Sequence, residues 1–186
     1  MDSNDIKYYD EFEHGLLRDM LRFCTSAGML DGDLLQSDDV EGKWKEFAPE
    51  YLADALPQMN EYPEVAFGWA GYIGMAVAEW WDKDWKKHCK DGYRTLYGKR
   101  GFDDMDDRIV EDILGYGHGS LEAKALAGVM FSCARMAMDR IRHEQVESQT
   151  EKAFHVIARS MRTMFRIGAA IRLYKLGYSL HKIHLS

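Results

Sequence analysis

The sequence contains little proline, few cysteines and no long uncharged run. Its 186 residues include three prolines, at positions 49, 57 and 63, so no proline interrupts helices after Pro63. Its three cysteines, Cys24, Cys89 and Cys133, are far apart and form no CxxC pair, which favours free thiols in a reducing compartment. The longest uncharged run, Val65–Ala78, has 14 residues. A membrane-spanning helix needs roughly 20, so we expect no membrane segment.

The sequence also lacks signs of strands or of a targeting segment. Apolar and polar residues do not alternate over stretches of strand length, and no Asn-Gly hairpin turn occurs. The first residues, MDSNDIKYYDEFEH, are acidic and polar, unlike a signal peptide. With 46% apolar and 30% charged residues, the chain can fill a core and solvate its surface. We therefore expect one soluble, cytoplasmic domain that covers residues 1–186.

Apolar residues instead recur every three to four positions along most of the chain. This spacing predicts an all-α bundle of five or six mostly antiparallel helices. In the fifth of them, the apolar stripe is expected to begin at Leu121. The predicted helices cover residues 4–27, 38–57, 63–89, 103–114, 120–147 and 150–176. Pro49 could divide the second, and the last two could form one kinked rod because Ser-Gln-Thr is a weak helix breaker.

The helix predicted over residues 63–89 carries a stripe of small residues. Ala66, Ala70, Gly74 and Ala78 are four residues apart, with Gly68 and Gly71 beside them. A glycine inside a helix costs about 1 kcal/mol relative to alanine, so a close approach of another helix or of a ligand is expected here. The ligand hypothesis places a small-molecule pocket at Gly71, Glu79, Trp80 and Trp81. There, burial beside tryptophan would raise the pKa of the Glu79 carboxyl. The alternative is that the tryptophans belong to the core or cover it.

One group of residues has the spacing of metal ligands. His143, Glu147, Glu151 and His155 follow one another at four-residue steps, and on an unbroken helix they would share one face. Imidazole and carboxylate together suit zinc, iron or manganese, so these four are candidate metal ligands. The alternative is a solvated face with ion pairs, because the surrounding segment is the most polar of the chain.

Two further motifs have a structural and a functional interpretation. Asp103, Asp104 and Asp107 match the DDxxD spacing that can hold Mg²⁺ and a diphosphate. They also suit the first turn of a helix, where carboxylates cap free N–H groups and complement the dipole. The glycine-rich segment Gly115–Ser120 could bind phosphate, but it follows a predicted helix rather than a strand, which favours a flexible turn.

Charge is unevenly distributed along the chain. Residues 1–150 carry 17 Lys and Arg against 30 Asp and Glu, whereas residues 151–186 carry seven Lys and Arg against one Glu. The acidic remainder would repel a polyanion, so nucleic acid is not an expected partner. We expect Arg159, Arg162 and Arg166, which share a helical face, to be neutralised by acidic residues within the fold.

Three functions are compatible with these patterns. The favoured hypothesis is a non-catalytic intracellular interaction or regulatory module that binds a protein partner or a second copy of itself. The alternatives are a metal-dependent enzyme or sensor using the His143–His155 stripe, and a small-molecule binder beside the glycine-rich helix. The sequence names no reaction and no cofactor.

Overall fold

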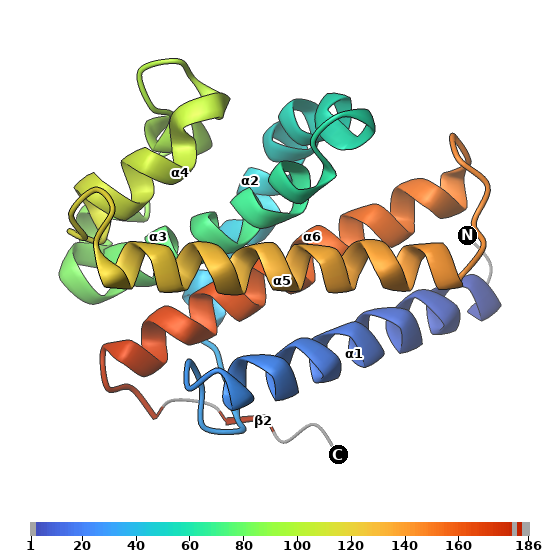
Figure 1. Cartoon of the computed structure of the whole chain (residues 1–186), viewed down its shortest axis with the longest axis horizontal. Helices are drawn as coiled ribbons and strands as arrows, with labels where there is room; N and C mark the ends of the chain where they lie inside the picture. The colour runs from blue at the N-terminus through green and yellow to red at the C-terminus, as the bar shows by residue number, and fades with distance from the viewer. Residues whose placement is uncertain (1–2, 180–181, 184–186) are drawn as a thin grey trace.

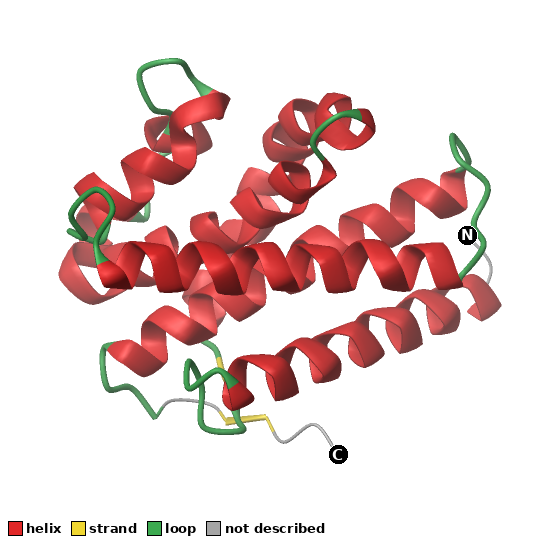
Figure 2. Ribbon diagram, in the orientation of Figure 1, coloured by secondary structure: helices red, strands yellow, loops and turns green. Residues whose placement is uncertain are grey.

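The computed structural model describes residues 3–179 and 182–183, and it confirms the predicted all-α bundle. Figures 1 and 2 show long helices that cross one another, joined by short connections. The α-helices of the described residues are α1 (Ser3–Ser26), α2 (Asp38–Ala55), α3 (Pro63–His88), α4 (Met105–Asp107), α5 (Leu121–His143) and α6 (Glu151–Lys175). No helix in this described part is long and apolar enough to cross a membrane.

The centre of the bundle is the contact between α3 and α6. Gly71 and Gly74 of α3 face α6, and a Cβ added at Gly74 would lie 2.8 Å from the backbone nitrogen of Ala169. On the other side of the contact, a Cβ added at Gly168 would lie 2.9 Å from the Cα of Gly71. The small residues predicted the close approach of either a helix or a ligand, and in the structure a helix, α6, packs closely against them.

The first helix runs antiparallel to α5 and parallel to α6. Tyr8 near the start of α1 donates a hydrogen bond to Glu144 at the end of α5, while Cys24 near the end of α1 contacts Cys133 in the middle of α5. Figure 1 shows α1 and α5 side by side, with α5 nearest the viewer. This position leaves one face of α5 on the outside of the molecule.

The proline positions have the expected effect only in part. Pro49 lies inside α2 and does not divide it. The α-helix ends at Ala55, just before Pro57, and the chain continues as a 3₁₀-helix, η1 (Leu56–Asn60). Pro63 is the first residue of α3, where its missing N–H costs no hydrogen bond.

The last two long helices are separate. The helix α5 ends at His143, four residues earlier than predicted, and α6 begins at Glu151. Between them Gln145 and Gln149 adopt positive φ angles of 50° and 63°, which no α-helix accommodates. The side chain of Thr150 then accepts a hydrogen bond from the backbone N–H of Ala153 at 3.1 Å and caps α6.

The region before α5 is built from short helices of different types. The 3₁₀-helices η2 (Tyr93–Leu96) and η3 (Phe102–Asp104) precede α4, and a π-helix, η4 (Arg108–Ile113), follows it. The sequence predicts one short α-helix over residues 103–114, so the extent is confirmed and the type is not. Two strands that the sequence does not reveal, β1 (Leu34–Leu35) and β2 (Lys182–Ile183), pair antiparallel and are two residues long.

Candidate functional site

The four predicted metal ligands are divided by the break between α5 and α6. His143 is the last residue of α5, Glu147 lies in the connection, and Glu151 and His155 lie in the first turns of α6. Only Glu151 and His155 are brought together, with 3.5 Å between Oε1 and Nε2. The single helical face that the metal hypothesis requires is therefore not formed. Within residues 3–179 and 182–183, no group of three or more His, Cys, Asp or Glu side chains is arranged to hold a metal ion.

Protein atoms occupy the space beside the predicted ligand-binding residues of α3. A side chain added at Gly71 would collide with the sulfur of Met130 from α5. Trp80 is buried and stacks on His88, with ring centroids 5.1 Å apart and an angle of 6° between the planes. Trp81 is half-buried and packs against the core from outside. This geometry corresponds to the alternative interpretation, in which the tryptophans form and cover the core.

Glu79 is the centre of a buried polar network between α3 and α6. Its carboxylate accepts a 2.5 Å hydrogen bond from Nε of Arg172 and lies 2.8 Å from Nζ of Lys83. Arg172 also donates to the hydroxyl of Tyr116 at 2.8 Å. The side chain of Glu79 is only 4% exposed, so its charge is balanced by the two cations rather than by water. This arrangement is structural, because each polar group already has a protein partner.

The basic face of α6 is neutralised within the fold, as predicted. The buried carboxylate of Glu13 on α1 lies 2.5 Å from Arg159 and 3.2 Å from Arg162. Glu41 on α2 accepts a 2.9 Å hydrogen bond from Nε of Arg166. These three arginines therefore join α6 to α1 and α2, and their charges are largely used within the molecule.

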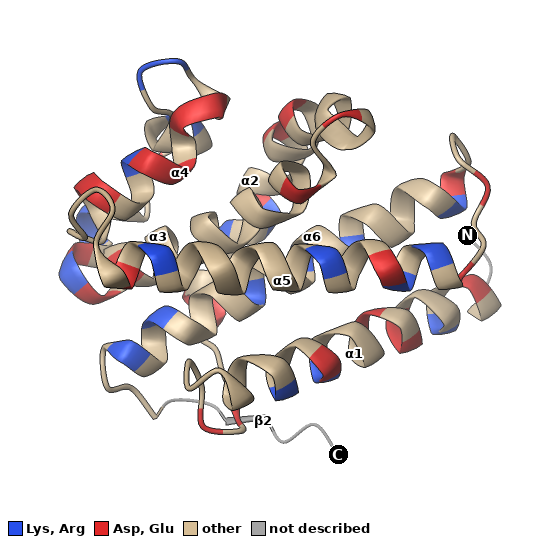
Figure 3. Cartoon of the chain, in the orientation of Figure 1, with Lys and Arg blue, Asp and Glu red and all other residues tan. Residues whose placement is uncertain are grey.

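Of the aspartates around α4, Asp104 contacts a basic loop rather than capping the helix. Asp104 is the N-cap residue of α4, yet its carboxylate accepts hydrogen bonds from the backbone N–H and the guanidinium of Arg100. Figure 3 shows this loop in blue beside the acidic α4. Burial raises the pKa of Asp106 to about 6, and the neighbouring carboxylates of Asp107 and Asp104 add to the shift. Carboxylates also cluster at solvated helix N-termini for structural reasons. Their presence here therefore does not define a functional site.

The glycine-rich segment Gly115–Ser120 connects η4 to α5. Gly115 and Gly119 have positive φ angles of 76° and 68°, which glycine adopts without strain. The side chain of Ser120 accepts a hydrogen bond from the backbone N–H of Ala123 at 3.2 Å and caps α5. The segment is thus an interhelical turn, as its sequence context indicates.

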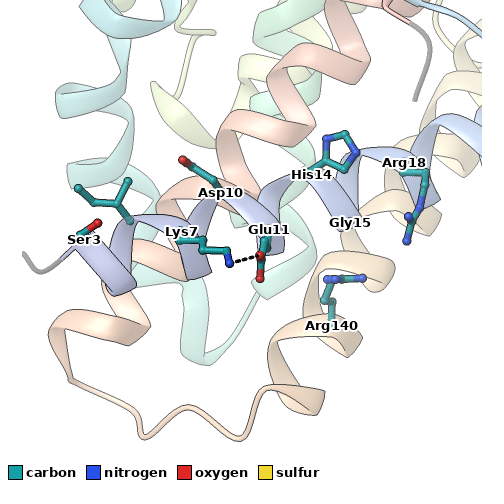
Figure 4. Close-up of a pocket in the computed structure, with 9 residues that line it drawn as sticks. Ser3, Lys7, Asp10, Glu11, His14, Gly15, Arg18 and Arg140 are labelled. Atoms are coloured by element: carbon teal, nitrogen blue, oxygen red, sulfur yellow. Dashed lines mark ion pairs between the residues drawn. The ribbon is translucent and has the colours of Figure 1, made fainter. Parts of the chain in front are cut away.

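A groove of about 660 Å³ lies between α1 and α5 (Figure 4). The guanidinium of Arg140 lines this groove and lies in the space that a side chain at Gly15 would fill. Most of its charged side chains have protein partners: Lys7 lies 3.7 Å from Glu11, and Arg140 lies 3.2 Å from Asp19. Because most of these charged side chains already form ion pairs within the protein, the groove is not a prepared ligand-binding site. Its lining residues are Ser3, Ile6, Lys7, Asp10, Glu11, His14, Gly15, Arg18 and Arg140.

The outer face of α5 carries two exposed large apolar side chains. Leu121 and Phe131 are 82% and 50% exposed, so the expectation that Leu121 begins the buried stripe is wrong. The small residues Ala125, Ala127 and Gly128 lie exposed between them. The exposed Lys124 lies between Leu121 and Phe131 on the same side of the helix, so the sequence pattern does not mark this face as an apolar seam. We call residues 121–131 on this side of the helix the α5 face.

Comparison of the chain with protein-family models, with curated proteins and with solved structures found no match.

Proposed function

We propose that the chain is a non-catalytic, intracellular interaction module that self-associates through the α5 face. The observation that carries this proposal is the exposure of Leu121 and Phe131, at 82% and 50%, on the outer side of α5. Apolar side chains that cluster on a surface with a polar rim are typical of protein contacts. The free thiols and the expected reducing compartment support an intracellular location.

The shape of the α5 face suits close contact with another helix. Gly128 lies at its centre, and no described heavy atom lies within 4 Å of the position where its Cβ would be. Ala125 and Ala127 on either side are also small, so another helix can approach this backbone closely. Phe131 then supplies a large side chain that fills the hollow which small residues leave on a facing helix.

A two-fold contact of the α5 face with itself favours a second copy of the chain as the partner, because the same surface then serves both sides of the interface. If two α5 helices pack antiparallel about Gly128, the exposed Leu121 and Phe131 of each copy lie against the helix of the other copy. Antiparallel packing also opposes the two helix dipoles favourably. By contrast, the arginines of α6 that could attract nucleic acid are paired with Glu13 and Glu41.

Sedimentation velocity over a concentration series tests this proposal. One helix face buries less than a standard interface, so we expect a dimer that dissociates at tens of micromolar, on the order typical of small contacts. The double variant Leu121→Glu, Phe131→Glu should remain monomeric. The control Tyr62→Glu changes a residue that is 57% exposed and lies outside α5, and it should dimerise like the natural chain.

A larger side chain at Gly128 tests the close approach of the two helices. Gly128→Leu should weaken the dimer, because no described heavy atom lies near this position and the added side chain would hold the two helices apart. A chain that stays monomeric at several hundred micromolar, or a dimer that is unaffected by the variants at positions 121 and 131, would overturn the proposal. Circular dichroism of each variant establishes that the helices are intact.

A further inference from the structure

Two buried thiols from distant parts of the sequence are in contact. Cys24 lies in the last two turns of α1 and Cys133 in the middle of α5, and their Sγ atoms are 3.7 Å apart. Neither side chain is exposed to solvent. The third cysteine, Cys89, follows α3, where its thiol donates to the carbonyl oxygen of Lys86. The first two thiols are therefore a pair, and Cys89 serves as an internal comparison.

We propose that Cys24 and Cys133 form a reversible oxidation site, at which hydrogen peroxide produces a disulfide that ties α1 to α5. A disulfide requires the two sulfurs to approach to about 2.05 Å, and the thiols already lie at van der Waals contact. Closing the remaining distance requires rotation of the two side chains and movement of the end of α1 toward α5. The inference does not depend on the proposed self-association.

The two thiols have different roles in this reaction. The hydrogen bond to Cys24 and burial both raise the pKa of the Cys133 thiol, so Cys133 stays protonated in the folded chain. Cys24 is the thiol that can be reached first, because residues 26–28 after it are exposed at the end of α1. Helix ends open more readily than helix interiors, which gives peroxide transient access to Cys24.

The chemistry then proceeds in two balanced steps. The thiol of Cys24 loses its proton, and the resulting thiolate attacks one oxygen of hydrogen peroxide. The O–O bond breaks, Cys24 becomes a sulfenic acid, and the released hydroxide takes up a proton to give water. The sulfur of Cys133 then attacks the sulfenic sulfur, loses its proton and displaces a second water. In total the two thiols lose two electrons and two protons, and the peroxide is reduced to two waters.

The disulfide would connect the first helix of the chain to the fifth. It would close a loop that includes α2, α3 and α4, and such a long loop restricts the unfolded chain strongly. We therefore expect the oxidised protein to melt at a higher temperature than the reduced protein. Reduction with dithiothreitol should restore the original melting temperature.

Peptide mapping of the Cys89→Ser variant tests the site. After treatment with hydrogen peroxide, a non-reducing digest should contain a peptide pair linked through Cys24 and Cys133. When Cys133→Ser is added to this variant, the sulfenic acid at Cys24 cannot be resolved and should react with dimedone. Adding Cys24→Ser instead should leave Cys133 unlabelled, which separates the assigned roles.

The reactivity of Cys24 and Cys133 toward peroxide in the unfolded chain is the reference for the folded protein. If both thiols remain free in the folded protein under peroxide conditions that oxidise both in urea, the oxidation site is overturned. Separate oxidation of the two sulfurs without a link between them would overturn it equally. Should the serine variants fail to fold, peptide mapping of the natural chain distinguishes these outcomes.

Discussion

Gly168 of α6 lies against Gly71 of α3, so that a Cβ added at Gly168 would stand 2.9 Å from the Cα of Gly71. The two helices touch through their backbones at this point, which only residues without side chains permit. The helix propensity lost at these glycines, about 1 kcal/mol each, is offset by the close packing of α3 on α6.

Replacement of Gly74 by alanine should destabilise the protein strongly. Its Cβ would lie 2.8 Å from the backbone nitrogen of Ala169, so the two helices must move apart. We expect the free energy of unfolding in urea to fall by about 3 kcal/mol. Gly68→Ala in the same helix is the control, because no described heavy atom lies within 4 Å of its added Cβ; stability should rise by up to about 1 kcal/mol. Equal effects of the two variants would contradict the assigned contact.

Loss of the Glu79 carboxylate should be more harmful than loss of the whole ion pair. Glu79→Leu leaves Arg172 buried without its 2.5 Å partner, and we expect a loss of about 3 kcal/mol in the free energy of unfolding. The double variant Glu79→Leu, Arg172→Leu removes both charges, so its loss should be smaller than the sum of the two single losses. Strictly additive losses in urea titrations would show that the two side chains do not interact.

The free energy of unfolding should decrease as pH rises through the range in which Asp106 titrates. Burial raises the pKa of Asp106 from 3.8 to about 6, so between these values the folded chain retains a proton that the unfolded chain releases. The free energy of unfolding therefore falls as pH rises through this window and stays lower above it. Asp106→Asn should remove this contribution and stabilise the protein by about 1 kcal/mol at pH 7, after allowance for solvent screening. As a control, Asp103→Asn changes an exposed residue. In the same urea titrations at pH 4 and pH 7, its free energy of unfolding should show the fall with pH that Asp106 causes.

The capping side chains of α5 and α6 should each contribute to stability. Ser120 and Thr150 accept hydrogen bonds from the backbone N–H groups of Ala123 and Ala153 at 3.2 and 3.1 Å. Replacing either with alanine should lower the unfolding free energy by about 1 kcal/mol. Ser37 occupies the same position at the start of α2 but makes no capping hydrogen bond within the described residues, so Ser37→Ala should have a smaller effect in thermal melts.

Glycine should be favourable at the break between α5 and α6. Gln149 has a φ of 63°, a conformation that costs an ordinary side chain roughly 1 kcal/mol and costs glycine nothing. Gln149→Gly should therefore raise the melting temperature, whereas the neighbouring Ser148→Gly should lower it or leave it unchanged. If both substitutions destabilise the protein alike, the two helices are not separated by this turn in solution.

The sequence by itself determined the helical architecture and most helix positions. Apolar spacing is set by the 3.6-residue turn, so it indicates a helix wherever it persists, and Pro63, Ser120 and Thr150 mark helix starts through local hydrogen bonding. The small residues around Gly71 likewise indicated that another group packs closely against this helix, but they did not show whether that group is a helix or a ligand.

Only the tertiary structure decided which surfaces meet. The break at Gln145 and Gln149 separates His143 from Glu151, and its positive φ angles carry no sequence signal such as glycine. The helix α5 is apolar on more than one side, so periodicity alone could not tell that Leu121 is exposed while Met130 is buried. Which apolar side faces inward depends on the crossing of α5 over α3 and α6, a contact between residues far apart in the chain.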